Sequence, residues 1–334
     1  MKKIGIFTGY YLPHLGGVER YTEKLSEQLR KMGYEIVIIT SNHDHLEKIE
    51  KQDMKIYRLP IYNLFKARYP LPKKNKEFRD LICQIEQEDF DYYICNTRFH
   101  LTTLIGCKMA RKKNKPLLIL DHGSSHFTVN NKVLDWLGEK YEHWLTNRVK
   151  KYQPRFYGVS HRCNTWLTHF NIHASGVLYN AIDSSADTKY HNKKYFEPKK
   201  DKVIITYAGR IIREKGIVLL LDAVTSLHKK FSNIELYVAG NGPILEELKE
   251  KYAKSYIHFE GKLDYDDVMS LYNVTDIFVY PSMFPEGLPT SILEAGIMEC
   301  AVIATDRGGT VEVITDDRYG LIMEETKQDL ITKL

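Results

Sequence analysis

Residues 203–231 read VIITYAGRIIREKGIVLLLDAVTSLHKKF, a strand pattern followed by a helix pattern. A short β-branched and aromatic run, Val203–Ala208, precedes a loop bounded by glycines and then an amphipathic stretch from Gly216 to Phe231. A continuous apolar run of this length predicts a strand buried on both faces, as in parallel sheets. Because parallel strands are joined by crossovers, units of this kind predict an α/β fold when they repeat.

The same alternation continues through the rest of the chain. The other predicted strands of the second half are Glu235–Ala239, His258–Glu260, Ile277–Tyr280 and Val302–Thr305, and its other predicted helices are Ile244–Tyr252, Tyr265–Asn273 and Thr290–Glu299. The predicted strands of the first half are Lys3–Thr8, Glu35–Thr40, Lys55–Leu59, Tyr92–Asn96, Leu117–Asp121, Phe156–Val159 and Gly176–Tyr179. The first helix ends at Gly33 and is marked by apolar residues three or four positions apart, namely Val18, Tyr21, Leu25, Leu29 and Met32. This repetition predicts doubly wound sheets with right-handed crossovers.

A polar, lysine-rich segment separates the two halves. Residues Ile182–Lys202 show almost no periodicity and are predicted to be a linker. We expect an N-terminal α/β domain at residues 1–180, a linker at 181–202 and a second α/β domain at 203–334. Open α/β sheets bind ligands at the carboxyl ends of their strands, so a ligand is expected in a cleft between two such domains.

The composition narrows the class of protein. With 334 residues, 43% of them hydrophobic and 27% charged, the chain is typical of a globular protein. Its longest aliphatic run is Ile217–Leu221, whereas a membrane-spanning helix needs about 20 apolar residues. Five cysteines without a CxxC pair predict a reduced, cytoplasmic protein with buried thiols. A net charge of +5 argues against nucleic acid as a partner and is compatible with a phosphate-bearing ligand or an anionic membrane surface.

Two cationic residues follow the first strand of the second domain. Arg210 and Lys215 lie in the loop Gly209–Gly216, at a strand end where a ligand is expected. Arginine offers a planar fork and lysine a compact charge, so both can bind one diphosphate. The alternative is a solvated basic loop with Glu214 as the ion-pair partner. The position at the strand end favours the diphosphate.

The most informative motif is PSMFPEGLPTSILEAG at residues 281–296. Its two carboxylates form an E-x7-E pair, with Glu286 on the loop after a strand and Glu294 about one turn into the next helix. A buried carboxylate needs a partner, and sugar or ribose hydroxyls provide one. The N–H groups of Gly287 and Leu288 would face a phosphate. The alternative is two unrelated acids, one exposed and one in a salt bridge.

Two glycine motifs are less specific. Gly16-Gly17 opens the first helix, where paired glycines let N–H groups approach an anion, although a tight turn is the alternative. Gly240 and Gly242 in AGNGP form a degenerate dinucleotide motif, which we interpret as a turn before a helix. No GxGxxG follows the first strand, and this absence weakens the hypothesis of a nucleotide-dependent oxidoreductase or epimerase.

Together these motifs resemble the retaining glycosyltransferases of family 4, which have the GT-B fold. The resemblance covers nearly the whole chain and rests on GGVER, GRIIREKG, AGNGP, the E-x7-E segment, and Gly308-Gly309 with Glu312, in the family's order. It implies two Rossmann-like domains facing across a deep cleft, with residues 1–180 as the acceptor-side domain and residues 203–334 as the nucleotide-sugar-binding domain. It also implies transfer of a hexosyl unit from a nucleotide-diphosphate sugar, UDP-sugar being favoured over GDP-sugar. Family members continue beyond the position of Gly320-Leu321-Ile322 with further helices, so the C-terminal helices are expected to be truncated here.

The resemblance also implies roles for individual residues. Arg210 and Lys215 would bind the diphosphate. Glu294 would bind ribose hydroxyls, and Glu286 hydroxyls of the donor sugar. His122, at the end of a first-domain strand, would contact the sugar near the reacting carbon. The remaining implied donor contacts are Gly16, Gly17, Leu263, Gly287 and Leu288. The predicted catalytic residues are Glu286, His122, Arg210 and Lys215.

The charges fit glycosyl transfer, in which a departing diphosphate must be stabilised. The two cations and helix N-termini would do so without a metal ion, since no DxD-type site follows a strand. His169 and His173 are spaced i, i+4 and His43-Asp44-His45 is compact, but neither has a third ligand nearby in sequence, so no metal and no other cofactor is expected. Because Glu286 is better placed to bind than to attack, a front-face retaining reaction is favoured over a covalent intermediate.

The acceptor is less well defined by the sequence. Basic residues are interleaved with aromatic and apolar ones in residues 64–76, and a second basic group lies at residues 108–115. Such segments can dock on an anionic membrane or form a solvated surface. The membrane interpretation implies a peripheral protein on the inner face of the cell membrane and a glycan or lipid-linked acceptor, and the lysine-rich composition hints at bacterial cell-envelope, capsule or exopolysaccharide synthesis. The alternative function is a non-catalytic GT-B partner subunit of a glycosylation complex, which would be expected to have lost its charged site residues.

Overall fold

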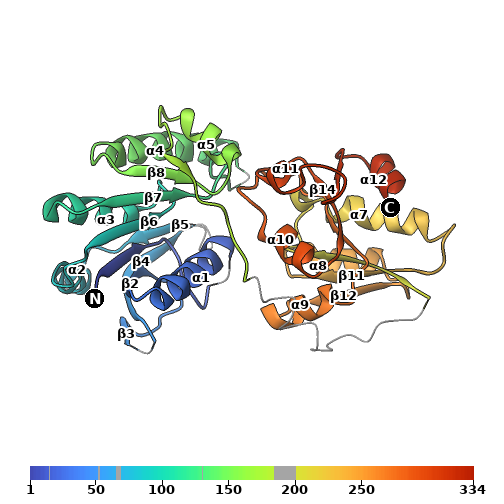
Figure 1. Ribbon diagram of the computed structural model, residues 1–334, viewed down its shortest axis with the longest axis horizontal. Coiled ribbons are helices and arrows are strands. Elements are labelled where there is room, and N and C mark those ends of the chain that lie inside the picture. Colours follow the sequence, from blue (N-terminus) through green and yellow to red (C-terminus); the bar gives the residue numbers. More distant parts are fainter. Residues whose placement is uncertain (15, 52, 65–68, 130, 184–200) are drawn as a thin grey trace. The chain divides into compact units, whose positions relative to one another are not determined.

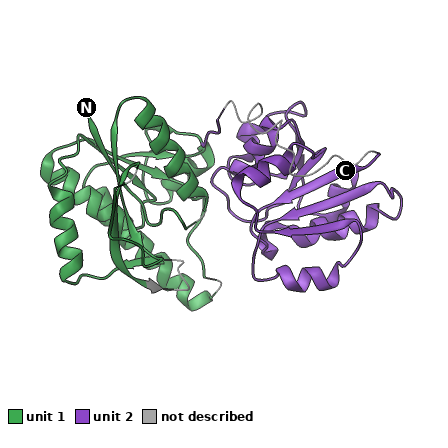
Figure 2. Ribbon diagram, turned by 90° about the horizontal axis from the view of Figure 1, so that it is seen from below, with its two compact units in different colours: residues 1–179 green, residues 180–334 purple. Residues whose placement is uncertain are grey.

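The computed structural model describes residues 1–14, 16–51, 53–64, 69–129, 131–183 and 201–334, and it divides the chain into two units (Figure 1). The first unit is Met1–Tyr179 and the second is Asn180–Leu334 (Figure 2). Most of the predicted linker therefore lies outside the described residues. Each unit has its own sheet, largely parallel in the first unit and wholly parallel in the second, with helices on both faces, which confirms the predicted doubly wound α/β class.

The first unit is built on a nine-stranded sheet with the path β3-β4-β2-β1-β6-β7-β8-β9 and with β5 paired to β4. The strands are β1 (Lys3–Phe7), β2 (Glu35–Asn42), β3 (Ile49–Lys51), β4 (Lys55–Leu64), β5 (Tyr69–Pro72), β6 (Tyr92–Asn96), β7 (Leu117–Asp121), β8 (Arg155–Gly158) and β9 (Gly176–Val177). Every pairing is parallel except those of β4 with β3 and β5. β3 and β5 have no counterpart in the sequence prediction, because their short polar or proline-containing runs lack an apolar pattern.

Helices cover both faces of this sheet. They are α1 (Gly17–Lys31), α2 (Lys76–Glu86), α3 (Leu101–Lys113), α4 (Lys132–Lys150) and α5 (His161–Thr168). Alternate residues of β1 enter different cores, with Ile4 and Ile6 on the side of α1 and Phe7 on the side of α3. This two-sided burial explains why the strand reads as a continuous apolar run.

The most deeply buried residues of helix α1 lie beside the apolar residues that its spacing predicts, of which Leu29 is partly buried against the core. Its buried residues are Glu19, Thr22 and Ser26, whereas Met32 is 71% exposed. The hydroxyls of Thr22 and Ser26 donate to carbonyls one turn earlier in the helix, and Asn96 Nδ2 donates to Thr22 Oγ1 at 2.6 Å. The Thr22 hydroxyl, which donates within α1 and accepts from Asn96, therefore joins the helix to the end of β6.

The second unit has a six-stranded, wholly parallel sheet with the order β12-β11-β10-β13-β14-β15. Its strands are β10 (Val203–Ala208), β11 (Ile234–Ala239), β12 (Ile257–Gly261), β13 (Ile277–Tyr280), β14 (Ala301–Thr305) and β15 (Leu321–Met323). Its helices are the 3₁₀ turn η1 (Arg213–Lys215), α7 (Ile217–Leu227), α8 (Leu245–Lys251), α9 (Tyr265–Tyr272), α10 (Thr290–Ile297), α11 (Thr310–Val313) and α12 (Lys327–Lys333). One apolar core lies under α7, α8 and α12, and the other under α9 and α10.

The predicted burial of the thiols is wrong for one cysteine. Cys83 is exposed, whereas Cys95, Cys107, Cys163 and Cys300 are buried, and all five are free thiols. Cys83 lies on α2, a helix whose buried residues are Leu81 and Ile85, so its own position points away from the core. Within the described part of the chain, no helix combines the length and the apolar character that crossing a membrane requires.

Candidate functional site

The strand order of the second unit brings two distant loops together. β10 and β13 are neighbours, and from this pair the chain proceeds outward in opposite directions. All strands are parallel, so the loops after β10 and β13 leave the sheet at the same edge. Open α/β sheets bind ligands at such a switch point, and these two loops carry the predicted residues Lys215 and Glu286.

Lys215 and Glu286 form an ion pair at this edge, with side chains that are 13% and 12% exposed. Oxygen Oε1 of Glu286 also accepts hydrogen bonds from the Tyr280 hydroxyl at 2.8 Å and from Ser282 Oγ at 2.7 Å. The Lys215 ammonium in turn lies 2.8 Å from the Tyr280 hydroxyl. One carboxylate oxygen thus has three neutral or cationic donors around it, and the pair is fixed in place before any ligand binds.

Aromatic side chains complete the surroundings of the Lys215 ammonium. Its Nζ lies 5.3 Å from the ring centroids of both Tyr280 and Phe284. Burial, together with the negative charge of Glu286, raises the pKa of Tyr280 well above its ordinary value, so its hydroxyl remains a hydrogen-bond donor. Burial and the same carboxylate also raise the pKa of Tyr207. The ion pair is therefore shielded from water on its aromatic side.

Two glycines allow the loops of this site to pack closely. Gly216 has φ +71°, and a Cβ there would lie 1.8 Å from the carbonyl oxygen of Pro281. Gly308 has φ +56°, and a Cβ there would lie 2.5 Å from the carbonyl oxygen of Glu286. Both positions thus require glycine twice over, for backbone conformation and for space.

The structure places the other predicted residues of this unit around the same edge. Arg210 is exposed on the loop after β10, and its carbonyl accepts from the Tyr207 hydroxyl at 2.9 Å. Glu294 is 5% exposed and lies about one turn into α10, as predicted. Leu288 is 6% exposed at the end of the Glu286 loop, and Leu263 follows β12 and is half-buried.

The AGNGP motif lies beneath the Arg210 loop. The Ile211 N–H donates to the carbonyl of Asn241 at 2.9 Å, and the Gly209 N–H donates to that of Ala239 at 3.0 Å. The motif thus supports the neighbouring loop through its backbone, in keeping with the structural interpretation of these glycines.

In the first unit, a carboxylate lies beside the predicted anion-binding glycines. α1 begins at Gly17, where a Cβ would meet no atom within 4 Å, but a Cβ at Gly16 would lie 2.4 Å from Glu19 Oε2. Glu19 is 7% exposed, and its Oε1 lies 3.2 Å from His14 Nδ1. This hydrogen bond raises the pKa of His14 against the effect of burial. The sequence analysis treats Glu19 only as part of a motif and misses this pair.

His122 directly follows β7, as predicted. Among the described residues its buried Nε2 has no hydrogen-bond partner, and its ring packs edge-to-face with that of Tyr21, with ring centroids 5.1 Å apart. Burial lowers the pKa of His122 to about 3, so the imidazole is neutral at physiological pH.

The sequence analysis misses a buried charge network next to His122. Arg98 is fully buried and donates to the carboxylates of Asp121 and Glu142, which are 0% and 1% exposed. Glu142 Oε2 also lies 2.9 Å from His126 Nδ1. Burial raises the pKa of Asp121, against the effect of Arg98. Two members of this network could have been noticed in the sequence as charged residues at strand ends, because Arg98 follows β6 and Asp121 ends β7. Glu142 lies in the middle of a helix, where nothing in the sequence marks it.

Of the two basic segments, the first is described only in part. Lys66 and Arg68 lie outside the described residues, and Tyr69, the aromatic centre of residues 64–76, is buried in β5. In the second group, Lys112 and Lys113 form ion pairs with Glu86 and Asp89. A different surface carries exposed apolar residues, all on α4: Val133, Leu134, Trp136, Leu137 and Trp144.

Comparison with known proteins agrees with this architecture. The profile described as Glycosyltransferase Family 4 matches residues 15–186, more than half of the chain, and the profile described as Glycosyl transferases group 1 matches residues 188–334. The chain belongs to glycosyltransferase family 4. An uncharacterized glycosyltransferase of Methanocaldococcus jannaschii is 26% identical to this family member over 99% of the chain and 88% of the relative. The phosphatidylinositol N-acetylglucosaminyltransferase GPI3 subunit of Saccharomyces cerevisiae is 22% identical over 98% of the chain and 73% of the relative.

Solved structures show that this family 4 member has the GT-B fold. Anabaena HepE in complex with UDP superposes with a TM-score of 0.70 at 16% identity, covering 99% of this chain and 88% of that one. Sucrose-phosphate synthase of Thermosynechococcus elongatus superposes with a TM-score of 0.73 at 16% identity, covering 100% and 88%. The predicted GT-B architecture of two Rossmann-like domains is therefore confirmed.

Proposed function

We propose that this glycosyltransferase moves a hexosyl unit from a nucleotide-diphosphate sugar to a glycan or lipid-linked acceptor. The observation that carries the proposal is the Lys215–Glu286 pair, held by Tyr280 and Ser282 at the switch point of the second sheet. UDP is the favoured nucleotide, and the HepE structures with UDP and with UDP-glucose support this choice.

The donor would lie across the carboxyl edge of the second sheet. Arg210 is exposed and can turn toward a diphosphate that Lys215 also contacts. Glu294, buried one turn into α10, would bind the ribose hydroxyls, and the N–H groups of Gly287 and Leu288 would face the diphosphate. Fixed positive charge stabilises the leaving group as its charge develops, so this assignment needs no metal ion on the diphosphate.

We further propose a retaining, front-face reaction. Oε1 of Glu286 already has hydrogen-bond donors from Lys215, Tyr280 and Ser282. Three donors on one oxygen draw negative charge away from the whole carboxylate and weaken it as a nucleophile, which favours a sugar-binding role for Glu286. The departing phosphate would then take the proton from the acceptor hydroxyl. A glycosyl-enzyme trapped covalently at Glu286 would contradict this mechanism.

Calorimetry with UDP, GDP and UDP-sugars tests the donor assignment. We expect Arg210→Ala to weaken UDP binding by about tenfold, the effect of losing about 1.4 kcal/mol of charge-assisted contact. The matched control is Arg213→Ala, three residues away on the same loop, because Arg213 is exposed and pairs with Glu247. Equal affinity of the wild type and both variants would overturn the assignment.

A hydrolysis assay separates the enzyme from a non-catalytic member of a glycosylation complex. We expect slow release of nucleoside diphosphate from the donor by the wild type and none above background by Glu286→Gln. If both proteins give the same background rate while UDP binds, the non-catalytic function is correct instead.

We propose a lipid-linked acceptor at an anionic membrane, in a pathway of the bacterial cell-envelope, capsule or exopolysaccharide kind. The name of the phosphatidylinositol N-acetylglucosaminyltransferase relatives supports a lipid acceptor. Trp136 and Trp144 on α4 are 57% and 48% exposed, and Lys140 and Arg148 lie over their rings. Tryptophans beside cations are typical of interfacial helices. Flotation with vesicles that contain anionic lipid should retain the wild type and lose Trp136→Ser; equal recovery with and without anionic lipid would exclude this surface.

A further inference from the structure

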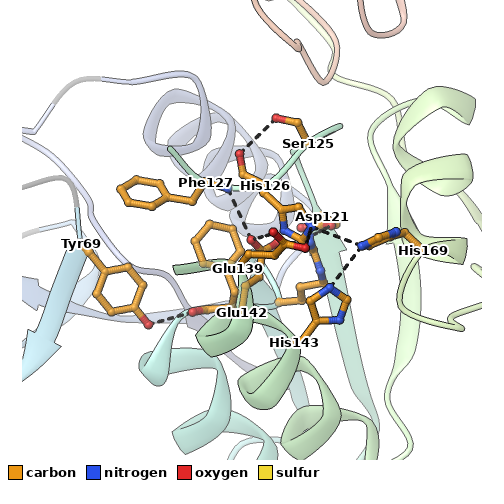
Figure 3. A network of polar contacts seen from close by, with 11 residues as sticks. Tyr69, Asp121, Ser125, His126, Phe127, Glu139, Glu142, His143 and His169 are labelled. Carbon is orange, nitrogen blue, oxygen red and sulfur yellow. Dashed lines mark hydrogen bonds and ion pairs between the residues drawn. The ribbon is translucent and has the colours of Figure 1, made fainter. Parts of the chain in front are cut away.

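Four side chains of the first unit converge on one point (Figure 3). His126 lies in the loop after β7, Glu139 and His143 lie one turn apart on α4, and His169 caps α5. We call this group the α4–α5 cluster. Its ligand atoms, one from each residue, all lie within 4.8 Å of one another. Three of the residues are partly buried, and His169 is exposed.

The spacing within the cluster is that of ligands around a small cation. His169 Nε2 lies 3.2 Å from His126 Nε2 and 3.2 Å from His143 Nε2. His126 Nε2 lies 3.6 Å from Glu139 Oε1. Two ligands on a tetrahedral zinc ion, each at about 2.0–2.1 Å, are about 3.3 Å apart.

Hydrogen bonds alone cannot satisfy all the ring nitrogens of this cluster. A ring nitrogen of histidine carries either one proton or one in-plane lone pair, so His169 Nε2 cannot donate to one histidine and accept from the other. His126 Nδ1 lies 2.9 Å from the Glu142 carboxylate, to which it donates, so a neutral His126 presents a lone pair at Nε2. A cation between the three nitrogens would use all three lone pairs at once.

The surroundings orient the rings as in a metal site. The contact between Glu142 and His126 is the carboxylate–histidine pairing that orients metal ligands, and Arg98 holds Glu142 from behind. His169 is stacked on Trp166 with ring centroids 4.8 Å apart and planes 7° apart.

We propose that the α4–α5 cluster binds one divalent transition-metal ion, and that zinc is the ion that its three imidazoles and one carboxylate fit best. Four protein ligands leave no open position, which is typical of a structural site. The ion would tie the loop between β7 and α4, which begins with His122, to α4 and α5. The sequence analysis pairs His169 with His173 and finds no third ligand, whereas the fold supplies three other partners for His169 from distant positions.

Metal analysis of the untagged full-length protein tests the proposal. After dialysis, elemental analysis should find about one zinc per chain in the wild type and in His173→Ala, and far less than one in His143→Ala. His173 is the matched control because it is an exposed histidine outside the cluster. A wild type that retains no zinc after reconstitution, or equal zinc in all three proteins, would overturn the proposal.

Two further measurements distinguish loss of a ligand from loss of fold. Cobalt added to the metal-free wild type should give the intense visible absorption of a tetrahedral ion, and His143→Ala should not. Zinc should raise the melting temperature of the wild type and not that of His143→Ala, while both melt alike in chelator. If His143→Ala does not fold, Glu139→Gln provides the same test, with zinc affinity expected to fall about tenfold or more. Millimolar binding that is the same in every variant would show an adventitious ion only.

Discussion

The hydroxyl of Tyr280 donates a 2.8 Å hydrogen bond to Oε1 of Glu286. The same hydroxyl lies 2.8 Å from the ammonium of Lys215, so one strand-end tyrosine touches both members of the ion pair at the proposed donor site. Tyr280 ends β13 and is 5% exposed, which gives the pair a rigid support on the sheet. A site held by a strand in this way is positioned before the ligand arrives.

Tyr280→Phe should therefore lower kcat and leave UDP binding nearly unchanged. The variant keeps the ring but frees Glu286 and Lys215 to shift, and a modest misplacement costs about tenfold in rate. The comparison is steady-state kcat and KM beside calorimetry with UDP. Tyr252→Phe, which removes a hydroxyl bonded to Asp222 in the same unit, serves as the control and should keep kcat. An unchanged kcat in Tyr280→Phe would exclude a positioning role for this hydroxyl.

Gly216→Ala should destabilise the second unit. The substitution places a Cβ 1.8 Å from the carbonyl oxygen of Pro281 at a φ of +71°, and we expect a loss of more than about 2 kcal/mol from the clash and the strained backbone. Gly138→Ala is the matched control, because a Cβ at this position within α4 meets no atom within 4 Å. It should stabilise the helix by about 0.5–1 kcal/mol. Urea denaturation of both variants checks the contrast, and equal effects would contradict the close loop packing.

Arg98→Leu should be severely destabilising to the first unit. The substitution leaves the carboxylates of Asp121 and Glu142 buried without their cation, and removing one partner of a buried pair costs about 3–5 kcal/mol. Lys112→Leu breaks an exposed pair with Glu86 and should cost less than about 1 kcal/mol. The measurement is again the urea midpoint. Similar midpoints for the two variants would show that Arg98 contributes no more than a surface charge.

Stability should fall as the pH drops below about 6.5, the ordinary pKa of histidine. Burial lowers the pKa of His122 to about 3 and that of His100 to about 4, so below pH 6.5 the unfolded chain binds more protons than the folded one. Each group contributes at most about 1.4 kcal/mol per pH unit. His14 acts in the opposite sense, because its hydrogen bond to Glu19 raises its pKa, and its contribution is present at low pH and lost as the pH rises.

Melting temperatures of the wild type and of His122→Asn between pH 8 and pH 5 isolate one of these groups. The variant should lose less stability on acidification than the wild type, because one proton-linked group has been removed. Parallel curves for the two proteins would show that His122 is protonated alike in the folded and unfolded chain.

Local sequence pattern accounts for most elements of the fold. The strands at Tyr92–Asn96, Leu117–Asp121, Val203–Ala208 and Ile277–Tyr280 lie at their predicted residues, because a strand buried on both faces must be apolar throughout. The motifs of the proposed donor site could also be recognised in the sequence, because Lys215 and Glu286 each follow such a strand. The deep burial of Thr22 and Ser26 on α1 could not be predicted, because both hydroxyls donate within the helix and Thr22 also accepts from Asn96, a contact that spacing cannot indicate.

Short-range patterns of polarity in this chain account for the succession of strands and helices, the family motifs and the two loops that carry the charged residues of the proposed donor site. Three arrangements depend on folding in three dimensions: the Tyr280 hydroxyl against Lys215 and Glu286, the Arg98 network, and the α4–α5 cluster. Each joins side chains from separate elements of the chain. None of the three can be predicted from a local pattern, because the partner of a buried polar group depends on which strands and helices become neighbours. Which elements are neighbours is a property of the packed sheet and not of any one segment.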